Sequence, residues 1–394
     1  LYFNIDREYD KLVRLLSDLG VGHVHFHHTM GLHPRLWVLA EALGCRHYLT
    51  IHDYYLINGN PTLTDEDASY VPESAHDFDE RCAEHYPLPE GVTAESWRDN
   101  QRLLVEGARR VIFPSHDVAA RFRRFFQIEE GVVAWHPDYE LSKPYPQPVW
   151  SYTKERPLKV LVLGAISREK GADVLESVAE AMDAAAVEFH LLGYAYRGLS
   201  EEVVTHGPYA QEDVYELVST LAPDVVWYPA LWPETYSYTL SVALHLGLPV
   251  VVPDIGAFVE RVAQRPLSVV QPWNSSLADW RVFWSHIISE GHLPVTQPLA
   301  LDPTESARKD FYIADYLQPV QAKQGALTAR ALASLSGNYH VGVPQLTGSE
   351  KFLGRIWRIS RRPVVAKVVS LVPFRMQQAI KRRLSRRPMH DIVR

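Results

Sequence analysis

The 394-residue chain is 46% hydrophobic and 22% charged, a globular composition that excludes collagen-like, intrinsically disordered and disulfide-scaffold proteins. Its formal charge of −7 is the sum of two opposed parts. Residues 351–394 hold thirteen Lys/Arg and one acidic residue, about +12, whereas residues 1–350 hold 27 basic and 46 acidic residues, about −19. The C-terminal tail (residues 351–394) and the body of the chain (residues 1–350) are therefore expected to have different roles.

The cysteine content and the first residues of the sequence indicate the cellular compartment in which the protein is expected. Cys45 and Cys82 are too few for a disulfide framework and have no metal-ligand spacing. The opening Leu-Tyr-Phe-Asn lacks the regions of a secretory signal, and no apolar run approaches the roughly 20 residues of a membrane span. We therefore expect a cytoplasmic location.

The first third of the chain alternates strand-like and helix-like segments. Strands are predicted at 21–28, 46–53 and 109–115, and helices at 9–20, 34–44 and 96–108. This alternation is typical of βαβ units with a parallel sheet. The polar, aperiodic segment 53–95 predicts a lid, a binding loop or a partly disordered stretch.

A Pro-rich linker at 140–157 precedes a second and more regular alternation. Strands are predicted there at 157–166, 186–195, 225–230 and 248–254, and helices at 169–184, 211–224 and 234–247. The sequence thus predicts an α/β protein with two Rossmann-like, doubly wound domains facing a cleft, where ligands bind at the carboxyl ends of the strands. The expected parts are an acceptor-side domain at 1–145, a donor-binding domain at 146–300, a helical cross-over at 301–350 with helices at 305–318 and 322–336, and a basic amphipathic tail at 351–394.

The most informative stretch runs from Pro229 to Gly247. Glu234 is expected to open a helix whose first turns carry Thr235, Ser237 and Thr239. Free backbone N–H groups and hydroxyls at such a helix start can bind an anion. The alternative is that these side chains only cap the helix.

A second stretch, LGAISREKGADVL at 163–175, passes from a buried strand through a loop into a helix. The loop carries Gly164, Arg168, Lys170 and Gly171, which places two cations at the same edge of the sheet. It matches neither the P-loop nor the Gly-x-Gly-x-x-Gly pattern, and a solvated Arg/Lys pair is the simpler alternative. Together the two loops favour one site for a diphosphate-like group.

These segments, with LTIHDYY at 49–55, resemble the retaining, GT-B-fold glycosyltransferases of glycosyltransferase family 4, particularly the bacterial enzymes that build surface polysaccharides such as O-antigen. The resemblance covers about residues 20–265. It implies transfer of a sugar from a nucleotide-sugar donor to a glycan or lipid-linked acceptor, with retention and without a cofactor or required metal.

The resemblance assigns roles to individual residues. It puts Lys170 on the donor diphosphate, with Arg168 as a helper because Ala165 stands where the family usually has Arg. Glu234, the first Glu of the family's Glu-seven residues-Glu motif, would contact sugar hydroxyls near the anomeric carbon. Further assigned are Gly164, Ser237, Tyr238 and Thr239 on the donor, His52 against the transferred sugar, and His27 and His28 on the acceptor side.

Two departures from the family pattern leave alternatives open. Val242 replaces the motif's second Glu, whose charged hydrogen bond to the ribose would be worth about 1.5–3 kcal/mol. The first domain also looks abbreviated. A catalytically reduced scaffold module of a larger polysaccharide-assembly protein is therefore one alternative, and a sugar-nucleotide epimerase, which would need acid/base carboxylates, is another.

Four histidines near the chain start raise a metal hypothesis. His23, His25 and His27 alternate and would share one strand face, the arrangement that lets imidazoles meet a zinc ion. No acidic or cysteine partner has suitable spacing nearby. We therefore prefer the acceptor-side interpretation. The loop 133–138, with His136, is expected to be a hinge or a domain-closing segment rather than catalytic.

The tail mixes Lys and Arg with Phe, Ile, Val and Trp at helical spacing. Such a segment is drawn to anionic lipid, which predicts peripheral contact with the inner face of the cytoplasmic membrane. Packing against a partner protein and nucleic-acid binding are the alternatives. An acidic body without a recognition motif disfavours nucleic acid.

Overall fold

The computed structural model describes residues 4–138, 144–294, 307–316, 346–360 and 374–385, together with the single positions 365, 369, 372 and 392. The chain divides into two compact units. Residues 1–49, 107–110 and 318–394 form the first, and residues 50–106 and 111–317 form the second. The expected helix at 322–336 lies outside the described residues.

The first sheet has four strands in the order β1-β2-β3-β4. The strands are β1 (His23–Phe26), β2 (Arg46–Thr50), β3 (Arg110–Phe113) and β4 (Gly131–Val133), and the connecting helices are α1 (Ile5–Asp18), η1 (Pro34–Leu36), α2 (Leu39–Ala42), α5 (Ala94–Val105) and α6 (His116–Phe122). Within α5, a reciprocal capping box between Thr93 and Ser96 determines the first turn. The predicted order of strands and helices is confirmed.

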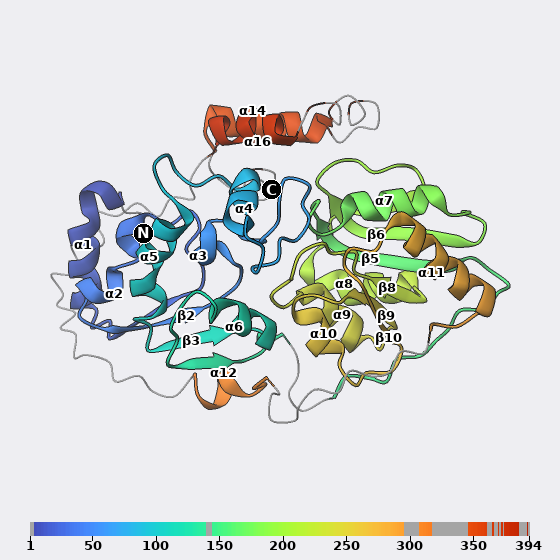
Figure 1. The fold of residues 1–394 in the computed structure, drawn as a ribbon, viewed down its shortest axis with the longest axis horizontal. Coiled ribbons are helices and arrows are strands. Elements are labelled where there is room, and N and C mark those ends of the chain that lie inside the picture. The colour runs from blue at the N-terminus through green and yellow to red at the C-terminus, as the bar shows by residue number, and fades with distance from the viewer. Residues whose placement is uncertain are drawn as a thin grey trace. The chain divides into compact units, whose positions relative to one another are not determined.

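The second sheet has six parallel strands in the order β10-β9-β8-β5-β6-β7 (Figure 1). The strands are β5 (Leu158–Ile166), β6 (Val187–Ala195), β7 (Val203–Gly207), β8 (Val225–Trp227), β9 (Val250–Pro253) and β10 (Ser268–Gln271), and the helices are α7 (Ala172–Ala181), η2 (Gln211–Asp213), α8 (Val214–Leu221), α9 (Tyr238–His245), α10 (Ala257–Val262) and α11 (Leu277–Glu290). This confirms the α/β prediction with two parallel, Rossmann-like sheets.

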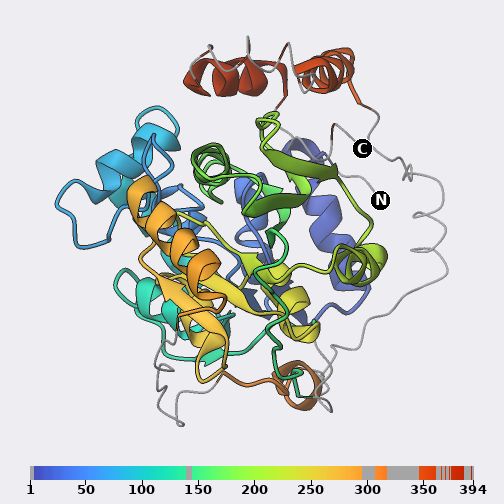
Figure 2. The same ribbon diagram turned by 90° about the vertical axis from the view of Figure 1, so that its right-hand side faces the viewer.

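The core of the second sheet is built around aromatic side chains. Trp227 of β8 packs against Trp280 and Trp284 of α11, with ring centroids 4.7 and 5.4 Å apart. Buried aliphatic residues of α7, among them Leu175 and Val178, complete this face. Figure 2 shows α7 and α11 on one side of the strands and α8 on the other, the doubly wound layout in which sheet and helices bury each other's apolar faces.

The segment 53–95 is more ordered than its sequence suggests. It contains α3 (Tyr55–Asn58) and α4 (Phe78–His85), and it buries Leu63, Ala68 and Val71 completely. Partial disorder is therefore the wrong expectation here. The apolar residues of this segment are scattered without a period, so the sequence pattern did not show that they form a core.

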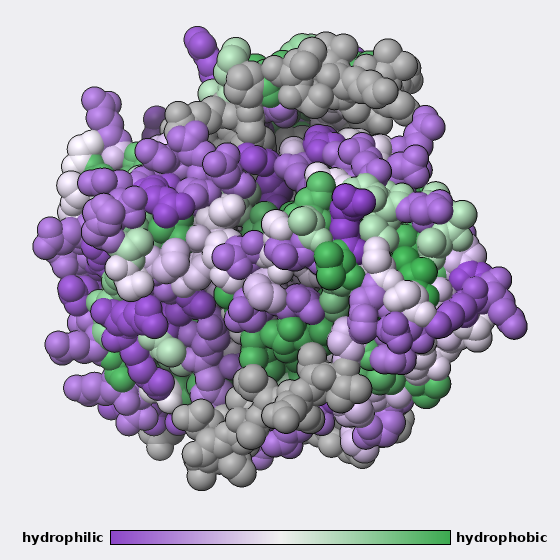
Figure 3. All heavy atoms as spheres, turned by 45° about the vertical axis from the view of Figure 1, so that its right-hand side comes forward, coloured by the Kyte–Doolittle hydropathy of each residue, from purple (hydrophilic) through white to green (hydrophobic). Residues whose placement is uncertain are grey.

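Toward the C-terminus the described residues include α12 (Phe311–Ala314), α14 (Gly348–Ser360) and α16 (Phe374–Leu384). The helical character of the basic tail is thus confirmed where the structure describes it. None of the described helices has the length and apolarity to cross a bilayer. The face shown in Figure 3 is largely hydrophilic, with apolar side chains in separate groups.

Candidate functional site

The two central residues of the predicted donor site form an ion pair. The Nζ atom of Lys170, in the loop after β5, lies 3.2 Å from Oε1 of Glu234, in the loop after β8. The Glu234 side chain is 9% exposed and the Lys170 side chain 41%. A buried carboxylate therefore holds a cation whose other side is open to solvent, which is the side that an anionic ligand would meet.

Glu234 does not open a helix, contrary to the sequence prediction. Helix α9 begins four residues later, at Tyr238, and its N-cap Ser237 has a left-handed φ of +67°. The segment before it is held by hydrogen bonds to other parts of the second unit: Tyr54 Oη donates to the Pro233 carbonyl at 2.9 Å, and Thr235 Oγ1 donates to the His52 carbonyl at 2.8 Å. These contacts prevent residues 233–237 from coiling into a helix.

Gly256 is the reason that the Glu234 backbone can lie where it does. A Cβ atom on Gly256 would sit 2.6 Å from the Glu234 carbonyl oxygen and 2.7 Å from its nitrogen. The following residue, Ala257, donates its N–H to the same Glu234 carbonyl at 2.8 Å. The start of α10 thus supports the loop that carries Glu234.

The N-terminus of α9 presents a set of backbone donors. The N–H groups of Ser237, Tyr238 and Thr239 find no acceptor within the described residues, and Ser237 Oγ lies 3.3 Å from Thr239 Oγ1. Gly164, two residues before the end of β5, lies so close that a Cβ there would be 3.0 Å from the Thr239 methyl. Gly164, Ser237 and Thr239, all predicted donor residues, are therefore neighbours at a helix start suited to an anion.

The buried side chain of Arg261 supports the turn before α9, and its role was not predicted from the sequence. It is 4% exposed, and its guanidinium donates to the carbonyls of Tyr236 and Ser237 at 2.9 and 2.8 Å and to Ser241 Oγ at 2.8 Å. It also stacks 3.9 Å from the Tyr236 ring. Drawing the two carbonyls toward Arg261 leaves the following N–H groups pointing away from it. No local pattern marked this residue, because its partners lie about 20 positions earlier.

His52, His136 and Tyr238 form a stack of three rings. The His52 and His136 rings lie 4.9 Å apart with an interplanar angle of 10°, and those of His136 and Tyr238 lie 5.3 Å apart at 8°. Tyr238 remains 50% exposed, while partial burial raises its pKa to about 12. The predicted sugar-facing His52 and the predicted donor residue Tyr238 are thus connected through His136. Asp53, next to His52, accepts the Tyr55 N–H at 2.9 Å and so caps the following turn.

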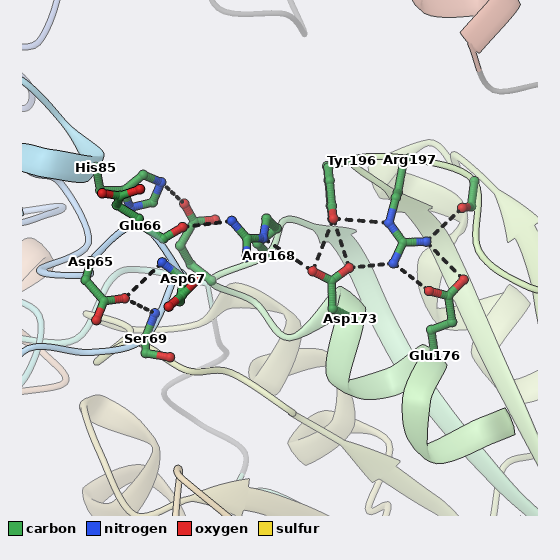
Figure 4. A network of polar contacts seen from close by, with 12 residues as sticks. Asp65, Glu66, Asp67, Ser69, His85, Arg168, Asp173, Glu176, Tyr196 and Arg197 are labelled. Carbon is green, nitrogen blue, oxygen red and sulfur yellow. Dashed lines mark hydrogen bonds and ion pairs between the residues drawn. The ribbon is translucent and has the colours of Figure 1, made fainter. Parts of the chain in front are cut away.

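Arg168 contacts both the 53–95 segment and helix α7 (Figure 4). Its Nη1 donates to the Glu66 carbonyl at 2.8 Å and its Nε to Asp173 at 3.3 Å. Asp173 in turn accepts from Tyr196 and Arg197. The role of Arg168 on a diphosphate stays a prediction, and what its contacts show is a tie between α7 and the 53–95 segment.

The neighbouring Glu169 strengthens this tie. Its carboxylate is buried, and Oε1 lies 3.3 Å from Nε2 of the buried His85 in α4. Burial lowers the pKa of His85, against the effect of Glu169. The 53–95 segment is therefore attached to the loop after β5 through polar groups that sequence reasoning had not connected.

The acceptor-side histidines belong to the first unit. His27 directly follows β1, and its ring lies 4.0 Å from that of His25 in β1. Burial lowers the pKa of His27. Within the described residues no group of three His, Cys, Asp or Glu side chains is placed to hold a metal ion. The acceptor roles of His27 and His28 stay predictions.

No protein-family model and no curated protein matches the sequence. Similar solved structures include sucrose-phosphate synthase from Thermosynechococcus elongatus, at 16% identity and a TM-score of 0.47 over 73% of this chain and 71% of that one. HepE of Anabaena, solved with UDP-glucose, has 14% identity and a TM-score of 0.48 over 72% of each chain. A glycosyltransferase from Rickettsia africae has 12% identity and a TM-score of 0.45 over 73% of this chain and 74% of that one.

Proposed function

We propose that the chain is a glycosyltransferase that moves a sugar from a nucleotide-sugar donor to a glycan or lipid-linked acceptor, with retention at the anomeric carbon, in the synthesis of a bacterial surface polysaccharide. The observation that carries the proposal is the convergence of Lys170, Glu234 and the α9 start. A cation, a carboxylate and N–H groups that have no acceptor among the described residues lie at one place and match the groups of a sugar diphosphate.

Each part of the donor then has a partner. The diphosphate lies against Lys170 and the N–H groups of Tyr238 and Thr239, whose charge and dipoles stabilise the departing phosphate. Glu234 accepts hydrogen bonds from sugar hydroxyls when Lys170 turns to the phosphate. The leaving phosphate takes the acceptor proton, so that the protein contributes positioning and electrostatics rather than a separate base.

His52 fits this arrangement through its position. Its carbonyl is fixed by Thr235, the residue after Glu234, and its ring is stacked on His136. A ring held in this way can donate to a sugar hydroxyl without the entropic cost of being ordered on binding. The proposal therefore gives His52 a role in orienting the transferred sugar.

The proposal requires no metal, because the diphosphate charge is met by Lys170 and the helix start. Treatment with EDTA is therefore expected to leave the transfer rate unchanged. A rate that falls with EDTA and returns on adding Mg²⁺ or Mn²⁺ would contradict this part of the proposal.

Calorimetry with UDP-, GDP- and dTDP-sugars tests donor binding directly. At least one nucleotide sugar is expected to bind, and Glu234→Ala is expected to abolish transfer while the far-UV circular dichroism spectrum stays unchanged. A folded protein that binds none of the nucleotides would contradict the glycosyltransferase proposal.

A catalytically reduced scaffold is the second candidate, and Val242 favours it. This residue is 7% exposed and apolar where the family has the ribose-binding Glu. A scaffold would bind no nucleotide sugar, so the same titration distinguishes the two candidates.

A further inference from the structure

Among the described residues near the C-terminus, helices α14 and α16 each have a less exposed and a more exposed side. In α14 the buried residues are Glu350, Leu353 and Gly354. Ser385, directly after α16, donates from Oγ to Oε1 of Glu350 at 2.8 Å, and α14 contacts α16. This side of α14 is therefore occupied by its contact with α16 and Ser385.

The other side of α14 exposes a stripe of apolar side chains. Phe352, Ile356 and Ile359 are 56%, 41% and 49% exposed. Their spacing of four and three residues places them on one face of the helix. Large apolar side chains that remain this exposed in a continuous row indicate a surface that meets an apolar partner.

A row of cations runs beside this stripe. Lys351, Arg355 and Arg358 are exposed, and each directly precedes one of the three apolar residues. The cations therefore form a second row parallel to the apolar one, about 100° away around the helix axis, the angle between successive residues of an α-helix. Glu350, the acidic residue of this helix, lies on the buried side instead.

Helix α16 repeats the combination of apolar and basic groups. Met376 and Ile380 are 56% and 50% exposed, four residues apart, and Arg383 is exposed three residues after Ile380. Both helices thus present large apolar side chains together with positive charge, the pattern of helices that lie in a lipid–water interface.

We propose that these outer faces of α14 and α16 bind the surface of a bilayer that contains anionic lipid. The apolar rows enter the boundary between headgroups and acyl chains, and the cations pair with lipid phosphates. The distribution of charge favours an anionic surface as the partner of this region, because residues 351–394 carry about +12 while residues 1–350 carry about −19. The proposal does not depend on the sugar-transfer function.

Flotation of the full chain with vesicles tests the proposal. The protein is expected to float with vesicles of phosphatidylcholine and phosphatidylglycerol, to stay in solution with phosphatidylcholine alone, and to be released by high salt. The variant Lys351→Gln/Arg355→Gln/Arg358→Gln is expected to bind the anionic vesicles about 100-fold more weakly, because each near-surface cation contributes about 1 kcal/mol to binding.

A second variant separates the apolar contribution from the charge. The variant Phe352→Ser/Ile356→Ser/Ile359→Ser keeps all cations, and we expect it to bind the anionic vesicles about tenfold more weakly than the unmodified chain does. Its matched control, Leu277→Ser/Val282→Ser, removes apolar side chains that are 44% and 71% exposed on α11, and is expected to bind as the unmodified chain does.

Three results would overturn the proposal. One is a folded chain that binds neither kind of vesicle, as expected if the tail is covered by another protein or by the acidic body. Another is flotation that both tail variants leave unchanged. The third is tight, salt-sensitive binding to a single-stranded oligonucleotide with none to vesicles, which would assign the cations to nucleic acid.

Discussion

Nζ of Lys170 and Oε1 of Glu234 lie 3.2 Å apart although they follow different strands, β5 and β8, of the second sheet. Parallel strands end at the same edge, so the loops that follow them meet there. The pair combines a nearly buried carboxylate with a cation that remains open on one side.

Replacing either member of this pair should have different effects on binding and turnover. Lys170→Met is expected to weaken binding of the free nucleotide diphosphate by about 10- to 100-fold, since a charged hydrogen bond is worth about 1.5–3 kcal/mol. Glu234→Gln should lower kcat far more than it lowers nucleotide affinity, because its proposed contacts are to the sugar.

Calorimetry and steady-state kinetics measure these two effects. Lys11→Met is the matched control, because it removes a Lys–Glu pair on exposed side chains of α1, with a 3.2 Å separation to Glu8. Nucleotide affinity that falls equally in the Lys11 and Lys170 variants would remove Lys170 from the site.

Arg261→Met should remove the hydrogen bonds that support the turn before α9. It leaves two backbone carbonyls and the Ser241 hydroxyl without their donor, at a cost to stability of about 1–3 kcal/mol for each buried group. Nucleotide affinity is expected to fall as well, and Arg261→Lys to restore part of it, because a lysine can still donate to one carbonyl.

Arg265→Met is the control for this experiment. Arg265 lies shortly after α10 and donates to the Leu248 carbonyl at 2.7 Å and to Ser268 Oγ at 3.0 Å, neither of which belongs to the turn before α9. We expect it to lower the urea midpoint without changing the nucleotide affinity of the folded protein. If both arginine variants lose affinity in proportion to their loss of stability, Arg261 is structural only.

Gly171 and Gly207 allow a comparison of steric and conformational costs. Both have left-handed φ values, +81° and +87°. A Cβ on Gly171 would lie 2.0 Å from the Pro229 carbonyl oxygen, whereas a Cβ on Gly207 would have no described residue within 4 Å other than its chain neighbours. Gly207→Ala should cost about 1 kcal/mol of unfolding free energy. Gly171→Ala should cost several times more or prevent folding, as thermal unfolding would show, and equal costs would contradict this close approach.

Glu260 is expected to make stability depend on pH. Burial raises its pKa to about 7, against hydrogen bonds from the N–H groups of His116 and Asp117, and Oε1 is buried without a partner in the described residues. An acid whose pKa is higher in the folded state binds more protons there, so its contribution falls as pH rises from about 4.5 to about 7.

Urea unfolding of the wild type and Glu260→Gln between about pH 5 and about pH 8 measures this dependence. The wild type should lose stability relative to Glu260→Gln as the pH rises through this range. Glu290→Gln, at the exposed end of α11, should change with pH as the wild type does. A constant difference between wild type and Glu260→Gln would show that Glu260 is not protonated in the folded protein.

The sequence predicted the elements well where a short-range pattern identified them. Strands β5, β6, β8 and β9 and helices α7, α8 and α9 of the second sheet were predicted from periodicity, because burial of one helix face or of a whole strand leaves a regular trace within ten to fifteen residues. Strands β7 and β10 and helices α10 and α11 were not predicted. Lys170, Glu234, Ser237 and Thr239 were likewise singled out together, since each follows a strand at the same sheet edge.

The sequence by itself thus determined the two α/β sheets, the loops at the edge of the second sheet and the opposed charges of body and tail. Only the tertiary structure decided where α9 begins, how Lys170 and Glu234 pair, and that Arg261 supports the turn between them and the helix. The physical reason is that residues 233–237 are shaped by hydrogen bonds from Tyr54, Ala257 and Arg261 and to His52, and such distant partners leave no periodic signal in the chain.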